Sequence, residues 1–168
     1  MIYNNKMRDM KKFLLLIICI LLIAGPVACG KAGAPAAVKV DGAEIPPFSF
    51  MVEDTEITDA VMAAYPVYSV ETTSTNTYGT TTTRVYVGYA MSDVLEAAGI
   101  TEAFSTLVTL ADDGYTVSVS KDVAMKPTTL TAISEDGKVF KKGLWFAPCV
   151  SDVSPDYLRD LALITLKD

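Results

Sequence analysis

The segment YAMSDVLEAAGI, which spans Tyr89–Ile100, carries the clearest signal of local structure in this sequence. Ser92 is of the type that begins helices, because its hydroxyl can accept a hydrogen bond from an amide of the first turn. The apolar positions that then share one helix face are Val94, Leu95 and Ala98. Gly99 follows at the place where many helices end in a left-handed residue. The segment therefore predicts a short amphipathic helix that Ser92 caps and Gly99 closes.

Segments rich in β-branched and aromatic residues lie on both sides of this helix and predict strands. The strands expected before it are 38–40, 48–52, 67–75 and 80–89. Asn76 and Tyr78-Gly79 lie between the last two, which predicts a hairpin or two neighbouring strands. The strands expected after it are 104–110, 115–120, 130–133, 138–140, 144–147 and 161–166. Asp136-Gly137 is typical of a two-residue hairpin turn. More sheet than helix is therefore expected.

The remaining helical signals are short. Thr58 predicts a capped helix as far as Tyr65, where Pro66 ends it. Ser120 predicts a short capped turn, and 156–159 leaves room for one turn of helix. The fold class expected from these patterns is α+β, with mixed sheets and few short helices.

The N-terminus predicts export. Lys11 and Lys12 precede an apolar run at 13–24, and Gly25-Pro26 ends that run before it reaches the roughly 20 residues that span a bilayer. Cys29 follows two small residues and resembles the acylated cysteine of a lipoprotein lipobox, although Pro26 stands where leucine is usual. We expect a signal peptide of the lipoprotein type at 1–28, a flexible tether at 29–37 and one domain at 38–168. Plain secretion and a retained anchor are the alternatives.

Composition excludes several kinds of chemistry. The chain has no histidine, so histidine-based catalysis and histidine-ligated metals are absent. After residue 28 it has one cysteine besides the predicted lipidation site, Cys149, so no intrachain disulfide framework is expected. That cysteine follows an apolar strand, which favours a small buried hydrophobe over a reactive thiol. The same part has 10 Lys and Arg against 19 Asp and Glu, which disfavours nucleic acid as a partner.

Five segments occur in an order that one family of domains shares. They are 89–100, 111–116, 130–138, 143–148 and 157–166. The first resembles a G-x-x-L-x-D-L-L-x-x-A-G helix, the second an S-x-D-G-Y turn and the third an L-A-Y-x-x-D-G-K hairpin. The fourth resembles a G-P-L-R-L-V-V-P strand and the last a W-V-K-x-L-x-x-I-x-V segment. Together they resemble the sulfite-oxidase-type molybdopterin-binding domain, which implies that fold for about residues 65–168, and loosely from 38.

The resemblance also implies where a cofactor would bind, and the residues there depart from the family. The family's molybdenum-ligating cysteine corresponds to the segment 70–76, which holds no cysteine. A threonine hydroxyl stays protonated and replaces a thiolate poorly. Arg84 is the only cation between Val40 and Lys121. We therefore expect no cofactor and no metal, and a non-catalytic envelope lipoprotein that binds a small ligand or a partner protein. The alternative is a molybdopterin-dependent redox enzyme, or its accessory subunit, that holds the cofactor without a thiolate.

A threonine-rich stretch is the expected place for a ligand. Eight of the thirteen residues at 71–83 are threonine, and they lie where the resemblance implies a cofactor cleft. The candidate ligand-binding residues are Thr72, Ser74, Arg84, Asp113 and Tyr115. Arg84 would hold an anionic group through its guanidinium. The competing explanation is that Arg84 only pairs with an acid on a neighbouring strand.

Overall fold

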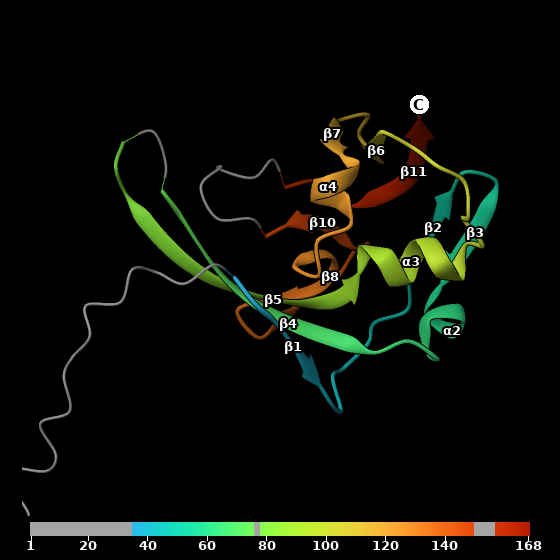
Figure 1. The fold of residues 1–168 in the computed structure, drawn as a ribbon. Helices are drawn as coiled ribbons and strands as arrows, with labels where there is room; N and C mark the ends of the chain where they lie inside the picture. Colours follow the sequence, from blue (N-terminus) through green and yellow to red (C-terminus); the bar gives the residue numbers. More distant parts are fainter. Residues whose placement is uncertain (1–34, 76–77, 150–156) are drawn as a thin grey trace, which may run out of the picture. The chain divides into compact units, whose positions relative to one another are not determined.

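The computed structural model describes residues 35–75, 78–149 and 157–168. The predicted signal peptide, Cys29 and most of the predicted tether lie outside the described residues. Strands dominate the described part and its helices are few and short, as the sequence predicts (Figure 1). The strands form two sheets.

The larger sheet is antiparallel and has six strands. Its order is β1 (Ala37–Val40), β4 (Val67–Thr75), β5 (Thr81–Ala90), β8 (Thr129–Glu135) and β10 (Trp145–Pro148), and β9 (Lys138–Val139) also pairs with β8. The β4–β5 hairpin is confirmed. The Asp-Gly turn between β8 and β9 is confirmed too, because Asp136 and Gly137 have φ of 49° and 74°, as a primed hairpin turn requires.

The second sheet is mixed and has five strands. Its order is β3 (Thr55–Thr58), β2 (Ser49–Val52), β11 (Leu161–Lys167), β6 (Thr106–Ala111) and β7 (Thr116–Ser120). β11 runs parallel to β2 and antiparallel to β6, so the second strand of the domain and its last strand lie side by side in one sheet. β3 was not predicted. Its alternation of exposed and buried residues is too short to stand out beside the helix signal at Thr58.

The first two helices follow the sequence in part. α2 (Asp59–Met62) begins at Thr58, whose hydroxyl accepts a hydrogen bond from the Val61 amide at 3.3 Å, but it ends before Tyr65. α3 (Met91–Ala97) ends as predicted, because Gly99 has φ of 72° and donates to the Glu96 carbonyl at 2.9 Å. This bond and its neighbour from Ile100 form a Schellman motif.

The predicted N-cap of α3 is wrong. Ala90 occupies that position, and Ser92 lies inside the first turn, where its hydroxyl contacts Asp93 Oδ1 at 3.5 Å. The physical reason is that β5 runs to Ala90 and continues directly into the helix, so that burial of Met91 fixes the start.

The last two helical signals also differ from the sequence expectation. α4 (Lys121–Ala124) has Ser120 at its N-cap, but the serine side chain makes no capping hydrogen bond. The expected turn of helix at 156–159 does not form at 157–159, because Leu158 pairs with Phe146 in an antiparallel bridge. Asp156 lies outside the described residues.

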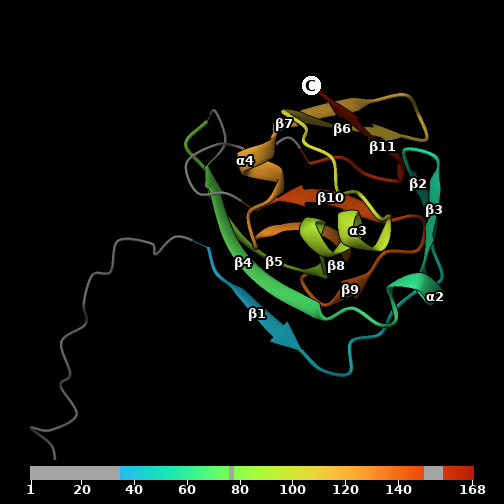
Figure 2. The ribbon, with the colours of Figure 1, turned by 45° about the vertical axis from the view of Figure 1, so that its right-hand side comes forward.

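Two apolar clusters hold the domain together. The main core lies between the sheets and includes Phe50 and Ile164 from the smaller sheet and Tyr89 from the larger one. α3 adds Val94 and Leu95 to this core and packs against β5 and β8 (Figure 2). The second cluster lies on the opposite face of the six-stranded sheet, which we call the outer face. It consists of Val70, Tyr86, Leu130, Ala132, Ala147 and Cys149.

Candidate functional site

The hairpin of β4 and β5 extends beyond the rest of its sheet (Figure 1). β1 pairs only with residues up to Val70, and the β5–β8 pairing starts at Tyr86, so 72–75 and 81–84 form a two-stranded ribbon. We call these residues the distal ribbon. Thr73 and Thr83 lie opposite each other on it, with their hydroxyls hydrogen-bonded at 3.0 Å.

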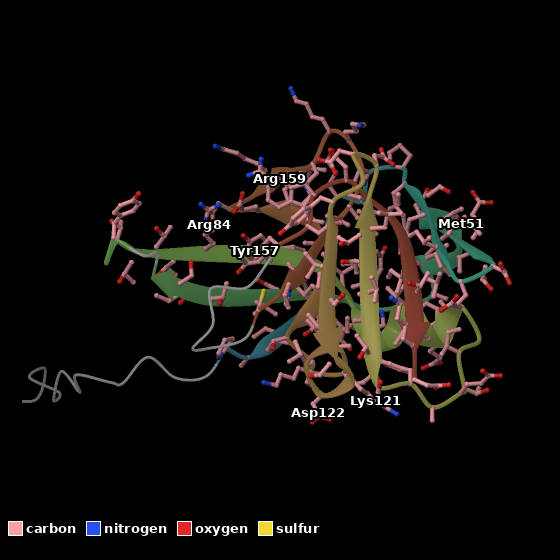
Figure 3. The ribbon with its side chains drawn as sticks, turned by 90° about the horizontal axis from the view of Figure 1, so that it is seen from above. Met51, Arg84, Lys121, Asp122, Tyr157 and Arg159 are labelled. Atoms are coloured by element: carbon pink, nitrogen blue, oxygen red, sulfur yellow. The ribbon has the colours of Figure 1, made fainter. Side chains whose placement is uncertain are left out.

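At the base of this ribbon, the outer face carries a row of interacting polar side chains. Arg84 forms an ion pair with Glu135 of β8. The hydroxyl of Tyr86 donates a hydrogen bond to the same carboxylate, with 2.9 Å between the hydroxyl oxygen and Glu135 Oε1. The ring of Tyr157 stacks on that of Tyr86, with centroids 5.0 Å apart, and its hydroxyl also interacts with the Thr72 side chain. Figure 3 shows Arg84 and Tyr157 on the same side of the molecule. We call these five residues the outer-face row.

The two tyrosines and the arginine of the row, and the thiol beside it, keep their protons at neutral pH. Burial raises the pKa of Tyr86 above its usual range and that of Tyr157 to about 12. The hydrogen bond to Glu135 raises the pKa of Arg84. Burial also raises the pKa of the Cys149 thiol to about 12. The site therefore offers neutral hydroxyls, a neutral thiol and one ion pair.

Three of the five predicted site residues lie together here. Thr72 and Arg84 are paired across the hairpin, and Ser74 is two residues along from Thr72, so all three point to the outer face. Thr72 is buried, with 4% of its surface exposed, whereas Ser74 is half-buried. The side chain of Arg84 is 42% exposed and bound to Glu135. This ion pair matches the competing explanation for Arg84, a pairing with an acid on a neighbouring strand.

The other two predicted residues lie on the second sheet. Asp113 and Tyr115 belong to the turn between β6 and β7, where the Asp113 carboxylate accepts a hydrogen bond from the Tyr115 amide at 2.9 Å. Tyr115 is 52% exposed. This turn therefore belongs to a different sheet from Thr72, Ser74 and Arg84.

Sequence reasoning missed Glu135 and Tyr157. Glu135 precedes the Asp-Gly turn, and register alone places it opposite Tyr86. Tyr157 reaches the row from a segment 71 positions further along the chain than Tyr86. No local pattern marks either residue, because their role depends on pairing between distant strands.

Beside the row, aromatic and cationic side chains stack at the β10 edge of the sheet. The rings of Phe140 and Trp145 are nearly parallel, at 10°, with centroids 4.2 Å apart. The guanidinium of Arg159 lies over the Trp145 ring, 4.5 Å from its centroid. Such a contact is a cation–π interaction.

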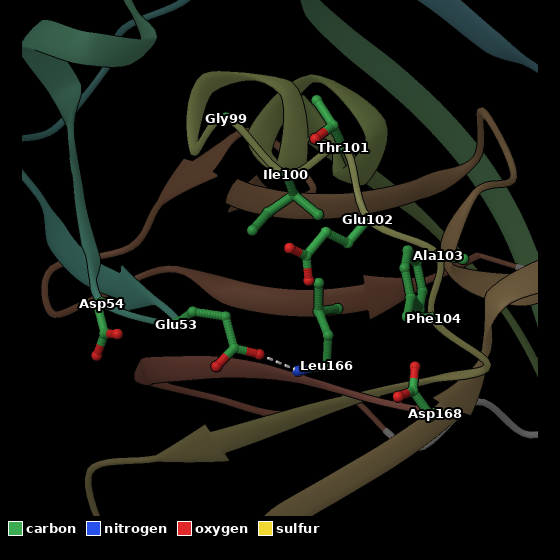
Figure 4. A pocket seen from close by; sticks show the side chains of 10 residues that line it. All are labelled: Glu53, Asp54, Gly99, Ile100, Thr101, Glu102, Ala103, Phe104, Leu166 and Asp168. Atoms are coloured by element: carbon green, nitrogen blue, oxygen red, sulfur yellow. Dashed lines mark hydrogen bonds between the residues drawn. The ribbon is translucent and has the colours of Figure 1, made fainter.

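A separate pocket of about 480 Å³ lies between the β2–β3 turn and the loop after α3 (Figure 4). Its acidic residues are Glu53, Asp54, Glu102 and Asp168, and its apolar ones include Ile100, Phe104 and Leu166. The Glu53 carboxylate accepts a hydrogen bond from the Leu166 amide. None of the five predicted site residues lines this pocket.

The residues present do not fit the cofactor that the family resemblance implies. Thr72 lies in the segment where the resemblance implies the metal-ligating cysteine. Its side chain is buried and hydrogen-bonded to that of Tyr157. Cys149 lies fully buried on the outer face as a protonated thiol. Arg84 is already bound to a carboxylate, which would compete with a pterin phosphate. Within 35–75, 78–149 and 157–168, no three acidic or thiol side chains converge as a metal site.

Comparison with protein-family models and with curated proteins finds no match for this chain. In the part of the chain that the structure describes, no helix is both long and apolar enough to cross a membrane.

Proposed function

We propose that this chain is an exported, lipid-anchored protein of the cell envelope, and that its domain binds a small ligand or a partner protein without catalysing a reaction. The order of the five segments supports a sulfite-oxidase-like, molybdopterin-binding-type scaffold, and the two sheets with few short helices are compatible with it. Fold resemblance alone carries no activity. The site must therefore support the function.

The outer-face row is the observation that carries this proposal. An acid–base or nucleophilic site needs a group with a suitable pKa, or a nucleophile that is paired with a base. In the row, the carboxylate of Glu135 is shared by Arg84 and Tyr86, and the hydroxyl of Tyr157 is engaged by Thr72. Burial raises the pKa values of Tyr86 and Tyr157, which keeps both hydroxyls protonated and weakly nucleophilic, so we assign the row to stabilising the base of the ribbon.

The distal ribbon is the surface that we assign to binding. Its strands bond to each other, its threonine hydroxyls are exposed at Thr73, Thr82 and Thr83, and Tyr78 near its tip is 92% exposed. A projecting ribbon is convex, whereas small-molecule sites are concave. The geometry therefore favours a partner protein over a small ligand.

Site-specific photo-crosslinking in the native host tests this assignment. A photoreactive phenylalanine analogue at Tyr78 should give a discrete adduct, seen as a shifted band or as a small-molecule mass increase. The same analogue at Tyr115, an exposed aromatic position on the other sheet, is the matched control and should give none. Equal labelling at both positions, or none at either, would contradict binding through the ribbon.

Two measurements on protein purified from the native envelope test the rest of the proposal. Intact-mass analysis should show a mature chain that begins at an acylated Cys29, and Cys29→Ala should abolish this processing. An unmodified Cys29 in the mature wild-type chain would refute the anchor. Elemental analysis should find molybdenum well below one atom per chain, and near-stoichiometric molybdenum would support the redox alternative.

A further inference from the structure

Four of the ten cations that follow residue 28 lie at the β9–β10 edge of the domain. They are Lys138, Lys141, Lys142 and Arg159. The turn from β9 to β10 brings the three lysines beside Phe140, and Arg159 lies over Trp145. We call Phe140, Trp145, Arg159 and the three lysines the aromatic–cationic edge.

Within the part of the chain that the structure describes, three of these cations form no ion pair. The acids nearest to this edge there are Asp112, Glu135, Asp136 and Asp160. Glu135 is bound to Arg84, and Asp112 is bound to Lys142 at 3.5 Å. Asp136 accepts a hydrogen bond from the Val85 amide, and neither Asp136 nor Asp160 forms an ion pair with the cations of this edge, all of which the structure describes. Among the described residues, Lys138, Lys141 and Arg159 form no ion pair, and all three are exposed.

Lysine, arginine and tryptophan at one edge are the residue types that contact the interface of a bilayer. Tryptophan sits at the headgroup level because its ring is apolar and its N–H is polar. Each lysine or arginine near an anionic surface strengthens association about fivefold. The acidic remainder of the domain opposes this only weakly, because salt screens charges beyond about 8 Å.

We propose that the aromatic–cationic edge docks on the anionic surface of the bilayer that holds the lipid anchor. This inference rests on the proposed anchoring at Cys29. Docking at this edge would fix the orientation of the domain on the membrane, with Trp145 at the headgroups.

The tether is long enough for this contact. β1 and β10 stand at opposite ends of the six-stranded sheet, four strand spacings or about 19 Å apart. The eight residues from Cys29 to Ala36 can span up to about 28 Å when extended. An anchor that leaves from β1 can therefore insert while the β10 edge rests on the same surface.

Trp145 is the only tryptophan in the sequence, so its fluorescence reports on this edge alone. The full lipidated protein is reconstituted with vesicles of phosphatidylcholine, with or without phosphatidylglycerol, and each contains a headgroup nitroxide lipid as a short-range quencher. We expect stronger quenching of Trp145 with phosphatidylglycerol, and loss of the difference at 1 M salt. Equal quenching on the two kinds of vesicle would overturn the proposal.

Charge-reversal variants provide a second test of docking at this edge. Lys138→Glu/Lys141→Glu should lower the docking equilibrium at least about 25-fold on anionic vesicles, since it removes two cations worth about fivefold each. Lys126→Glu/Lys167→Glu, an equal reversal of exposed lysines elsewhere, should change it less than about twofold. Equal effects of the two variants would mean that net charge, not this edge, governs the contact.

Flotation of the same samples separates the two proposals. Flotation with pure phosphatidylcholine requires the anchor. Flotation and quenching on anionic vesicles alone would refute the anchor and support the docking edge, whereas flotation on both kinds without extra quenching would support the anchor and refute the edge. Flotation on neither would refute both.

Discussion

Replacement of Gly88 by alanine tests the contact between the two central strands of the larger sheet. The pairing of β5 with β8 shifts by one residue between Val87 and Gly88, and the backbone of β8 comes close at that point. A Cβ atom on Gly88 would lie 2.2 Å from the Thr131 carbonyl oxygen and 2.6 Å from the Ala132 Cα. Both neighbours are backbone atoms of a buried strand, so neither can rotate away.

The size of the effect follows from two opposing contributions. Overpacking in a core costs about 1–3 kcal/mol, and contacts to backbone belong at the upper end. Alanine also lowers the conformational entropy of the unfolded chain, and this effect stabilises the folded protein by about 0.4–1 kcal/mol. We therefore expect Gly88→Ala to lower the free energy of unfolding by about 2–2.5 kcal/mol.

The measurement is urea unfolding of the soluble domain variants, followed by circular dichroism. Gly42→Ala is the matched control, because Gly42 has φ of 73° but no atom within 4 Å of the new Cβ. It should cost only the backbone strain of a left-handed alanine, about 1 kcal/mol. If Gly88→Ala were as stable as wild type, or more stable than Gly42→Ala, the close approach of β8 would be refuted.

Three further predictions concern side chains. In urea unfolding, Leu95→Ala should lower the free energy of unfolding by about 2–5 kcal/mol, because Leu95 is buried. Glu96→Ala should lower it by less than about 0.5 kcal/mol, because Glu96 is exposed. Equal unfolding midpoints for the two variants would refute the assigned helix face. Because burial raises the pKa of Cys149 to about 12, its alkylation at pH 8 should be at least about 100-fold slower in native than in unfolded protein. Comparable rates would show an accessible thiolate. Burial in the folded state raises the pKa values of Tyr86 and Tyr157 above the ordinary value of 10.0. The unfolded chain therefore loses these protons first, and the free energy of unfolding should fall as the pH rises above 10. Tyrosine absorbance that titrates fully near pH 10 without unfolding would contradict this.

Local patterns predicted the elements whose causes are local. The Gly99 terminus of α3, the Asp136-Gly137 turn and the β4–β5 hairpin are all confirmed, since each depends on backbone preferences of a few adjacent residues. The start of α3 was missed because burial of Met91, a tertiary effect, outweighs the capping preference of Ser92. The export signal and Cys29 remain predictions from sequence.

The candidate site was also predicted from the sequence only in part. The sequence by itself identified the threonine-rich ribbon and Arg84, because composition and the scarcity of cations are visible along the chain. Alternation of side chains also places Thr72 and Ser74 on one face. Only the tertiary structure decided that Glu135 neutralises Arg84 and that Tyr157 covers Tyr86. Pairing between strands 50 or more residues apart depends on the register of the whole sheet, which the packing of both sheets fixes and no short segment encodes.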